Sequence, residues 1–328
     1  TRAPADYSGG AARSLERVLL TGANGLIGGA LQRTLRPRLE IRRLVRSQPR
    51  PNEQSAFYWD PASGVIDARA FEDVDAVVHL AGEPVLGRWT RGKRRRVLES
   101  RVLGTRLVID AADRAGVRVV VSASAVGYYG CDPGDAAANE QAPCGDGFLA
   151  QVCREWERAA TDAITDHDRV RLVLARIGVV LSPNGGALGL MRRHAQRARL
   201  VMIAGRGDQP VPWISMPDTL RAIERCLEDP SLRGPINLVA PNPVTQRELA
   251  KSVATRCGAR TIHAPAPVLR LIAGDLAREV LLGGRRVTPT SLLDNGFRFQ
   301  HETLASALDE AVAETPDTEL DTELDTGP

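Results

Sequence analysis

Aromatic side chains and long apolar runs are both scarce in this sequence of 328 residues. Phe, Trp and Tyr together make up only 4% of the chain. No uninterrupted apolar run reaches the roughly 18–20 residues that a membrane-spanning helix needs. The first fourteen residues also lack the apolar stretch of a secretory signal. We therefore expect a cytoplasmic protein without a membrane partner.

Paired cysteines are also missing. The chain has five cysteines, none of them in a CxxC pair or at a metal-type spacing with histidine. An odd, scattered set is typical of reduced thiols inside the cell. We expect neither a disulfide framework nor a metal site from Cys131, Cys144, Cys153, Cys226 and Cys257.

The charge balance gives no sign of a nucleic-acid partner. The formal net charge is only +3, whereas nucleic-acid binding usually needs a clustered basic face. The basic run at Arg91–Arg96 lies in an amphipathic pattern without interleaved aromatics, so a solvated helix face is the simpler interpretation. The alternative is that Lys93 or Arg101 faces an anionic substrate or a phosphate.

Short apolar runs alternate with helical patterns along the first 180 residues. This rhythm is typical of βαβ units and predicts a doubly wound α/β fold with a parallel sheet. The predicted strands are 17–21, 40–45, 76–80, 117–122, 170–177 and 236–239. The predicted helices are 26–36, 94–112, 148–164, 188–199 and 218–228, followed by a largely helical stretch over 243–312 with a loop at 261–267.

A glycine turn joins the first strand to the first helix. Gly22 permits the tight turn, Gly25 lets backbone amides approach a pyrophosphate, and Gly28 lets helix and strand pack closely. The start of the helix then offers unpaired N–H groups to the phosphates. This Rossmann-type pattern predicts a dinucleotide site that includes Gly22, Asn24, Gly25, Leu26, Ile27 and Gly28.

The end of the second strand indicates which dinucleotide is bound. An NAD(H) site would have an acid there for the ribose hydroxyl, but this chain has Arg46 and Ser47. Arg46, with Arg43 or Ser47, can pair a 2′-phosphate, because guanidinium binds phosphate oxygens bidentately. We therefore favour NADP(H) over NAD(H); the alternative is that these arginines are surface charge.

Two domains with short flanking ends account for the rest of the pattern. We expect a flexible lead-in over 1–14 and a Rossmann domain over 15–181, to which 212–240 returns. A smaller, mixed substrate domain should comprise 182–211 and 241–312. Residues 313–328 carry six acids and no base, so we expect a disordered acidic tail.

Several stretches resemble one protein family. TGANGLIG, VVHLAGEP and VSASAVGYYG occur in the order seen in extended short-chain dehydrogenases/reductases. WDPASGVID, RIGVVLSPNGGALG and RRVTPTSLLDNGFRF are similar to an atypical subgroup of NAD-dependent epimerase/dehydratase-like proteins, often described as sugar-nucleotide epimerases. The resemblance covers about residues 17–312. It implies an NADP-type cofactor and a small-molecule substrate between two domains, with a homodimer through 94–112 and 148–164 as a further hypothesis.

The resemblance also implies where the cofactor lies. The end of the third predicted strand should border the ribose and pyrophosphate, Val121–Ser124 should pass under the nicotinamide, and Gly178–Leu181 should close over it. This agrees with ligand binding at the carboxyl ends of parallel strands. The further cofactor contacts predicted are Leu80, Ala81, Gly82, Arg101, Ser122, Ile177 and Gly178.

The family's usual catalytic pair is absent. Members that transfer hydride use a serine with Tyr-x-x-x-Lys on a helix, where the lysine lowers the tyrosine pKa. Ser124 fits the serine role, but the tyrosine and lysine positions hold Leu149 and Cys153. Tyr128, or its neighbour Tyr129, and Glu83 are the replacement candidates. Their simpler interpretations are a packed aromatic and a helix-start carboxylate.

Three functions therefore stay open at this point. In the first, the chain acts as an oxidoreductase or epimerase on a hydroxy or keto group, with Ser124, Tyr128 and Glu83 as catalytic residues. Alternatively, it catalyses a non-redox cyclisation, dehydration or isomerisation on the same fold, or it binds a partner in response to NADP(H). Five other polar or aromatic landmarks are interpreted as structural: His79 and Arg176 as satisfied core groups, Trp156 and Trp213 as core aromatics, and Asp218 as a helix cap.

Overall fold

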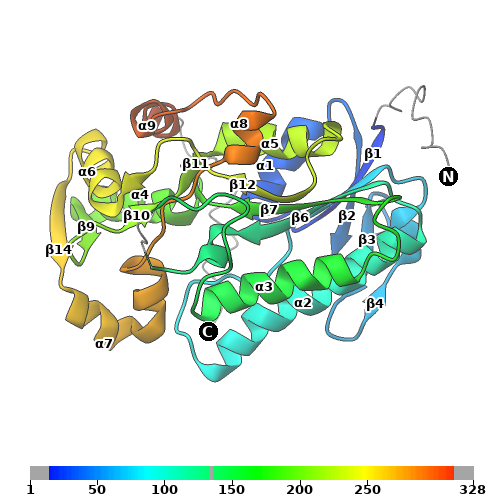
Figure 1. Cartoon of the computed structure of the whole chain (residues 1–328), viewed down its shortest axis with the longest axis horizontal. Coiled ribbons are helices and arrows are strands. Elements are labelled where there is room, and N and C mark those ends of the chain that lie inside the picture. Colours follow the sequence, from blue (N-terminus) through cyan, green and yellow to red (C-terminus); the bar gives the residue numbers. More distant parts are fainter. Residues whose placement is uncertain (1–14, 133–135, 314–328) are drawn as a thin grey trace, which may run out of the picture.

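The computed structural model describes residues 15–132 and 136–313 (Figure 1). The expectations for the lead-in over 1–14 and for the acidic end beyond residue 313 lie outside these residues. The division into a Rossmann and a substrate domain stays a prediction.

A mixed sheet of eight strands forms the centre of the molecule. Its order is β12-β7-β6-β5-β1-β2-β3-β4, and its pairs are parallel except for β3 with β4. Most of these strands are near-continuous apolar runs because helices cover both faces. The predicted doubly wound α/β fold is confirmed. The strands are β1 (Arg17–Thr21), β2 (Glu40–Val45), β3 (Ala56–Asp60), β4 (Val65–Ile66), β5 (Ala76–His79), β6 (Val119–Ala125), β7 (Arg171–Ile177) and β12 (Gly234–Leu238).

Helices cover both faces of the sheet. α1 (Leu26–Leu35) and α5 (Met216–Glu228) share one hydrophobic cluster with the strands, while α2 (Arg91–Arg114) and α3 (Phe148–Asp162) pack on the other face (Figure 1). Short 3₁₀ turns, η1 (Ala68–Phe71) and η2 (Val126–Tyr129), follow β4 and β6. Because β1, β5 and β6 run parallel, the loops that follow them lie at the same edge of the sheet.

The C-terminal half adds small sheets and helices with their own core around Trp213 and Leu188. β8 (Val179–Leu181) pairs with β11 (Trp213–Ser215), and β10 (Pro210–Val211) pairs with β13 (Val244–Thr245). The other elements are α4 (Gly186–Ala198), β9 (Leu200–Ala204), α6 (Gln246–Arg256), β14 (Arg260–Ala264), α7 (Ala266–Leu276), the π-helical η3 (Ala277–Leu281), α8 (Thr290–Asp294) and α9 (Leu304–Ala313).

Three sequence-based expectations are corrected here. The loop predicted at 261–267 is wrong: β14 pairs in parallel with β9, and α7 begins at Ala266. β14 is exposed along most of its length, so it has no hydrophobic pattern to mark it. β3 was not predicted either. The α5 cap is Ser215, whose hydroxyl accepts from the Asp218 amide, while the Asp218 carboxylate accepts from the amides of Gln300 and His301.

The C-terminal half is attached to the helices below the sheet by polar contacts. Glu279 of η3 accepts hydrogen bonds from the amides of Phe148 (2.9 Å) and Leu149 (2.8 Å) at the start of α3. Arg94 of α2 pairs with Asp275 of α7. An acid at a helix N-terminus is favourable because the amides there have no partner within the helix. Two structural halves thus meet beside the start of α3.

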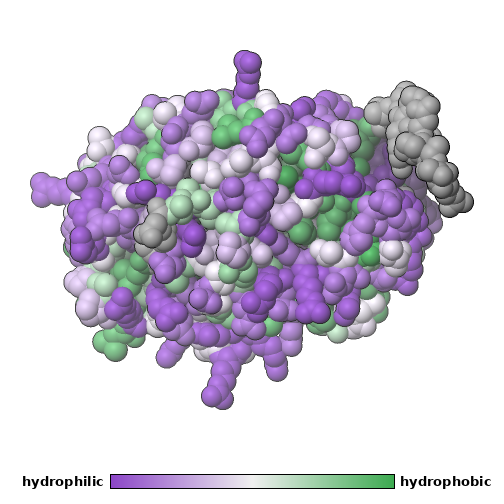
Figure 2. Space-filling view, viewed as in Figure 1, coloured by the Kyte–Doolittle hydropathy of each residue, from purple (hydrophilic) through white to green (hydrophobic). Residues whose placement is uncertain are grey.

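The molecular surface is largely polar on the face seen in Figure 2. Apolar groups gather in small separate areas, one of them over α7 at the lower left, where Leu271 is 87% exposed and Ile272 is 73% exposed. Within residues 15–132 and 136–313, no helix is both long and apolar enough to cross a bilayer.

Candidate functional site

The glycine turn after β1 is packed too closely for side chains. Gly22 has φ +68°, and a Cβ on it would lie 2.9 Å from the Leu80 carbonyl. A Cβ on Gly28 would lie 2.1 Å from the Gly22 oxygen. Only glycine lets the turn contact both the end of β5 and the first turn of α1. The start of α1 is thereby held at the carboxyl edge of the sheet.

The N-terminus of α1 is left open for an anion. Its N-cap is Gly25, no side chain caps it, and its first turn contains no acid. The first amides of a helix need an acceptor, and their dipole favours negative charge. These residues fit a dinucleotide pyrophosphate, in contrast to α3, whose first amides already bind the Glu279 carboxylate.

A buried histidine fastens β5 to its neighbours. His79 hydrogen-bonds Thr21 through Nδ1 (2.8 Å) and Thr105 through Nε2 (3.0 Å). Burial lowers the pKa of His79 to about 4, so the ring is neutral at physiological pH. The amides of Leu80 and Ala81 donate to the Thr21 hydroxyl. The interpretation of His79 as a satisfied core residue is confirmed.

The end of β2 presents basic and hydroxyl groups to solvent. Arg46 and Ser47 follow the strand and are both exposed. Arg43 is less available, because its side chain is 17% exposed and lies 3.7 Å from Glu53. Arg46 and Ser47 are therefore the stronger of the three candidates for a 2′-phosphate.

The candidate serine belongs to a buried charged network. The Ser124 hydroxyl donates to Glu157 of α3 at 2.7 Å. Arg176 of β7 binds both oxygens of that carboxylate, through Nε at 2.8 Å and Nη2 at 2.7 Å. Burial opposes the charge of Arg176, but these hydrogen bonds raise its pKa above the usual value. Arg176 is paired inside the protein, as predicted, and its partner fixes the direction of the serine proton.

The two neighbouring tyrosines have different surroundings. Tyr129 is buried; its hydroxyl accepts from Arg176 (2.9 Å) and donates to Asn237 (2.7 Å), and burial raises its pKa. Tyr128 is half-buried, and the Arg176 guanidinium lies 3.5 Å from its ring centroid. Within the described part of the chain, no group hydrogen-bonds the Tyr128 hydroxyl. Tyr128 is therefore free to meet a substrate, whereas Tyr129 is committed to the network.

Glu83 lies among cations just beyond β5. Its carboxylate is 2.8 Å from Lys93 Nζ and 3.6 Å from Arg96. The hydrogen bond from Lys93 is the main reason that the pKa of Glu83 is lowered. A carboxylate that stays ionised at neutral pH is a weak proton carrier. Glu83 stays a predicted site residue, with less support than Ser124 or Tyr128.

The positions of the missing Tyr and Lys contain no substitute for them. Leu149 lies in the first turn of α3. Cys153 is buried, and burial raises its thiol pKa to about 12, so it carries no charge at neutral pH. The guanidinium of Arg101, which belongs to α2, lies 4.9 Å from the ring centroid of Trp156 on α3.

The remaining predicted contacts lie at adjacent strand ends. Ser122 of β6 is fully buried, and its hydroxyl has no hydrogen-bond partner in the described residues. Ile177 ends β7, and the Gly178 amide donates to Leu238 at 3.0 Å. The strand order brings the ends of β1, β5, β6 and β7 side by side, with Arg46 and Ser47 across β1.

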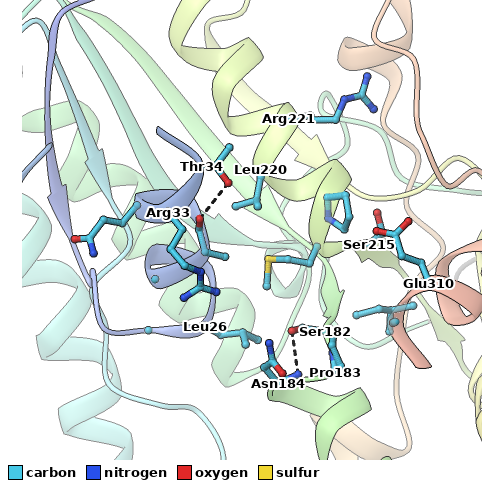
Figure 3. Close-up of a pocket in the computed structure, with 18 of the residues that line it drawn as sticks. Leu26, Arg33, Thr34, Ser182, Pro183, Asn184, Ser215, Leu220, Arg221 and Glu310 are labelled. Atoms are coloured by element: carbon cyan, nitrogen blue, oxygen red, sulfur yellow. Dashed lines mark hydrogen bonds between the residues drawn. The ribbon is translucent and has the colours of Figure 1, made fainter. Parts of the chain in front are cut away.

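A large groove adjoins the glycine turn. It has a volume of about 1350 Å³ and runs between α1, α5 and α9 (Figure 3). Asn24, Gly25 and Leu26 line one end of it, but Ser124, Tyr128 and Glu83 do not. The groove therefore shares part of the predicted cofactor site but none of the catalytic candidates.

Sequence reasoning missed the partners that orient the candidate site. Glu157 and Asn237 come from α3 and β12, and neither lies in a catalytic motif. The available signal was a buried arginine in need of an acid, together with an acid on the inner face of an amphipathic helix. No group of three or more His, Cys, Asp or Glu within the described ranges could hold a metal.

Comparisons with known proteins agree with this geometry. Residues 18–238 match the model of the NAD dependent epimerase/dehydratase family, and residues 264–311 match a domain of unknown function, DUF1731. The epimerase family protein Mb2239 of Mycobacterium bovis is 39% identical over 302 residues, which cover 89% of this chain and 96% of that protein.

Two solved structures are also similar. One is the human epimerase family protein SDR39U1 (isoform 2) with NADPH, with a TM-score of 0.78 and 32% identity over 91% of this chain and 100% of that one. The other is a nucleoside-diphosphate sugar epimerase from Corynebacterium glutamicum, with a TM-score of 0.74 and 31% identity, of which this chain spans only 58%. The resemblance inferred from the motifs is confirmed: the chain belongs to the NAD dependent epimerase/dehydratase family, within the extended short-chain dehydrogenases/reductases.

Proposed function

We propose that this protein binds NADP(H) and acts as an oxidoreductase or epimerase on a hydroxy or keto group of a small metabolite. The observation that carries the proposal is the open N-terminus of α1 at the glycine turn, with Arg46 one strand away. The human relative whose structure contains NADPH supports the choice of cofactor. When bound, NADP(H) supplies hydride transfer.

The cofactor residues divide between two kinds of contact. Backbone amides at Gly25 and Leu26 would bind the pyrophosphate, because the helix start leaves them without acceptors. Arg46 and Ser47 would bind the 2′-phosphate from beyond β2. The first contact is common to all dinucleotides, so the second decides the preference for NADP(H).

Ser124 and Tyr128 would handle the reacting oxygen. The Ser124 proton is directed to Glu157, so the lone pairs of its oxygen would accept a hydrogen bond from a substrate hydroxyl. The Tyr128 hydroxyl has its hydrogen available to donate, and the Arg176 cation lies against its ring. Together, such an acceptor and such a donor would orient one hydroxy or keto oxygen and exchange its proton.

Two measurements test this proposal in sequence. Calorimetry with NADPH and NADP⁺ measures binding, and absorbance of the reduced cofactor with a panel of ketones measures turnover. Tyr128→Phe should lower kcat by about 10²–10⁴-fold if Tyr128 transfers the proton. Tyr58→Phe, at a half-buried tyrosine of β3, is the matched control. Unchanged turnover after combined replacement of Ser124, Tyr128 and Glu83 would rule out this site.

The absent Tyr-x-x-x-Lys pair favours a second candidate function. With Leu149 and Cys153 in those positions, a non-redox cyclisation, dehydration or isomerisation needs only a shaped pocket and one acid/base pair. Product formation with no net change in NADPH absorbance at any substrate ratio, and no deuterium transfer from labelled cofactor, would favour this function over the first.

A further inference from the structure

The helix α3, which contributes Glu157 to the buried network, lacks a cap of its own. Its N-cap is Gly147, which has no side chain, and its first turn contains no acid. α6 differs, because Thr245 caps it from the adjacent position. The first amides of α3 instead donate to Glu279, which lies 131 residues from Phe148 along the chain. The start of α3 therefore depends on a residue of the C-terminal half.

Gly147 makes room for this carboxylate. A Cβ on Gly147 would lie 3.1 Å from Glu279 Cδ, and its φ of +108° is one that other residues rarely adopt. Both carboxylate oxygens are used, one by the Phe148 amide and the other by the Leu149 amide. Charge-assisted hydrogen bonds at the positive end of a helix dipole are strong. The contact is thus a close and specific fit between one acid and one helix start.

Glu279 is anchored in the C-terminal half. It lies in η3, whose Ala277 packs in a small apolar cluster with Ala204 and Leu269. The Gln209 side chain also donates to the last carbonyl of η3. All of these partners belong to the C-terminal half, so the position of that half determines where the Glu279 carboxylate lies.

The first turn of α3 packs against the loop of the candidate tyrosine. A Cβ on Gly127 would lie 3.4 Å from Leu149 Cβ and 3.7 Å from Cys153 Sγ. Gly127 precedes Tyr128 in η2, and the Tyr128 carbonyl accepts from the Gly145 amide at 2.9 Å, just before α3 begins. Protein interiors are close-packed and transmit strain. A displacement of the first turn of α3 would therefore reach Tyr128.

We propose that Glu279 is a positioning residue, which caps α3 from the C-terminal half and so couples the docking of that half to the position of Tyr128. This inference rests on the proposed function, because the role of Tyr128 in proton exchange comes from it. Tyr128 is then in place only when the two halves that enclose the substrate are docked together. The coupling also gives a physical reason for the missing local cap, which would hold α3 wherever the C-terminal half lies.

Amide exchange and fluorine NMR test this coupling without a substrate. Glu279→Gln keeps the length of the side chain but removes its charge and one acceptor oxygen. Exchange of the Phe148 and Leu149 amides should become about 10- to 100-fold faster, the loss expected for hydrogen bonds to a charged group. In protein labelled with 3-fluorotyrosine, the Tyr128 resonance should shift, while that of Tyr58 in β3 should not. Tyr128→Phe and Tyr58→Phe assign the two resonances.

Glu302→Gln is the matched control, because Glu302 is an exposed acid of the same half and should change neither readout. Glu279→Asp keeps the charge on a shorter side chain, so both effects should be smaller; should glutamine prevent folding, this variant carries the comparison. Unchanged exchange at both amides, or faster exchange with an unchanged Tyr128 resonance, would overturn the proposal. NADPH affinity in calorimetry should stay within about twofold of the wild type. A wild-type protein that binds no NADPH would instead contradict the proposed function, on which the exchange and NMR results do not depend.

Discussion

The two halves of the carboxyl edge of the sheet are constructed differently. Over β1 and β5, the candidate site consists mainly of backbone: a glycine turn, open helix amides and a strand end whose amides bind the Thr21 hydroxyl. Over β6 and β7, it consists of side chains from several elements, with Ser124, Glu157 and Arg176 in one buried network. Backbone donors depend on local conformation alone, whereas a side-chain network requires every partner to be present.

This contrast also determines which substitutions disrupt each half. The backbone half depends on no buried ion pair, and a Cβ on one of its glycines would disrupt it. The side-chain half has already removed Arg176 and Glu157 from water, so loss of one leaves an unpaired buried charge. Four predictions follow the contrast from its largest expected effect to its smallest.

Glu157→Gln should break the side-chain half most severely. It leaves the Arg176 guanidinium buried without its counter-charge, which costs about 3–5 kcal/mol of unfolding free energy. Urea denaturation measures the change. Glu155→Gln on the same helix, at a side chain that is 36% exposed, should change stability by less than about 0.5 kcal/mol. Equal losses of unfolding free energy in the two variants would show that the Arg176–Glu157 pair contributes no more to stability than an exposed side chain.

Gly28→Ala tests the backbone half. The new Cβ would lie 2.1 Å from the Gly22 oxygen, so we expect a loss of about 1–3 kcal/mol in stability together with weaker NADPH binding. The adjacent Gly29→Ala is the matched control, because its nearest contact is 3.5 Å away. Alanine there should stabilise the helix by up to about 1 kcal/mol. An unchanged NADPH affinity in Gly28→Ala would contradict the proposal that close packing at Gly28 is needed for cofactor binding.

Arg46→Ala tests the side chain that supplements the backbone half. Losing an exposed charge-assisted contact to the 2′-phosphate should weaken NADPH binding by about tenfold. NADH has no 2′-phosphate, so its affinity should not change, and the ratio of the two affinities in calorimetry is the measurement. A parallel loss for both cofactors would assign the phosphate contact to another residue.

Glu83→Gln addresses the region between the two halves, with the smallest expected effect. The pKa of Glu83 is lowered from 4.5 in the folded protein, so its contribution to stability is present at neutral pH and is lost as the pH falls below 4.5. For a partly exposed pair this amounts to less than about 1 kcal/mol. The stability difference between wild type and variant should therefore vanish in acid; a constant difference from pH 7 to pH 3 would rule out the ion pair as its source.

Local patterns in the sequence were sufficient to predict the backbone half of this edge. The apolar strands, the glycine turn and the basic end of β2 are each encoded within a few consecutive residues, and a parallel sheet follows from βαβ units. Exposed strands were not predictable in this way: Arg260–Ala264 is a strand only because Leu200–Ala204 lies beside it.

The partners within the side-chain half were decided by tertiary structure. Ser124 was recognisable from its motif, but its partner Glu157 lies 33 residues away and Asn237, which binds Tyr129, lies 108 residues from that tyrosine. Arg101 reaches the end of β5 from a helix whose sequence resembles a solvated basic face. Charged side chains acquire such roles from burial and from the partners that folding brings to them, and neither is written in the neighbouring residues.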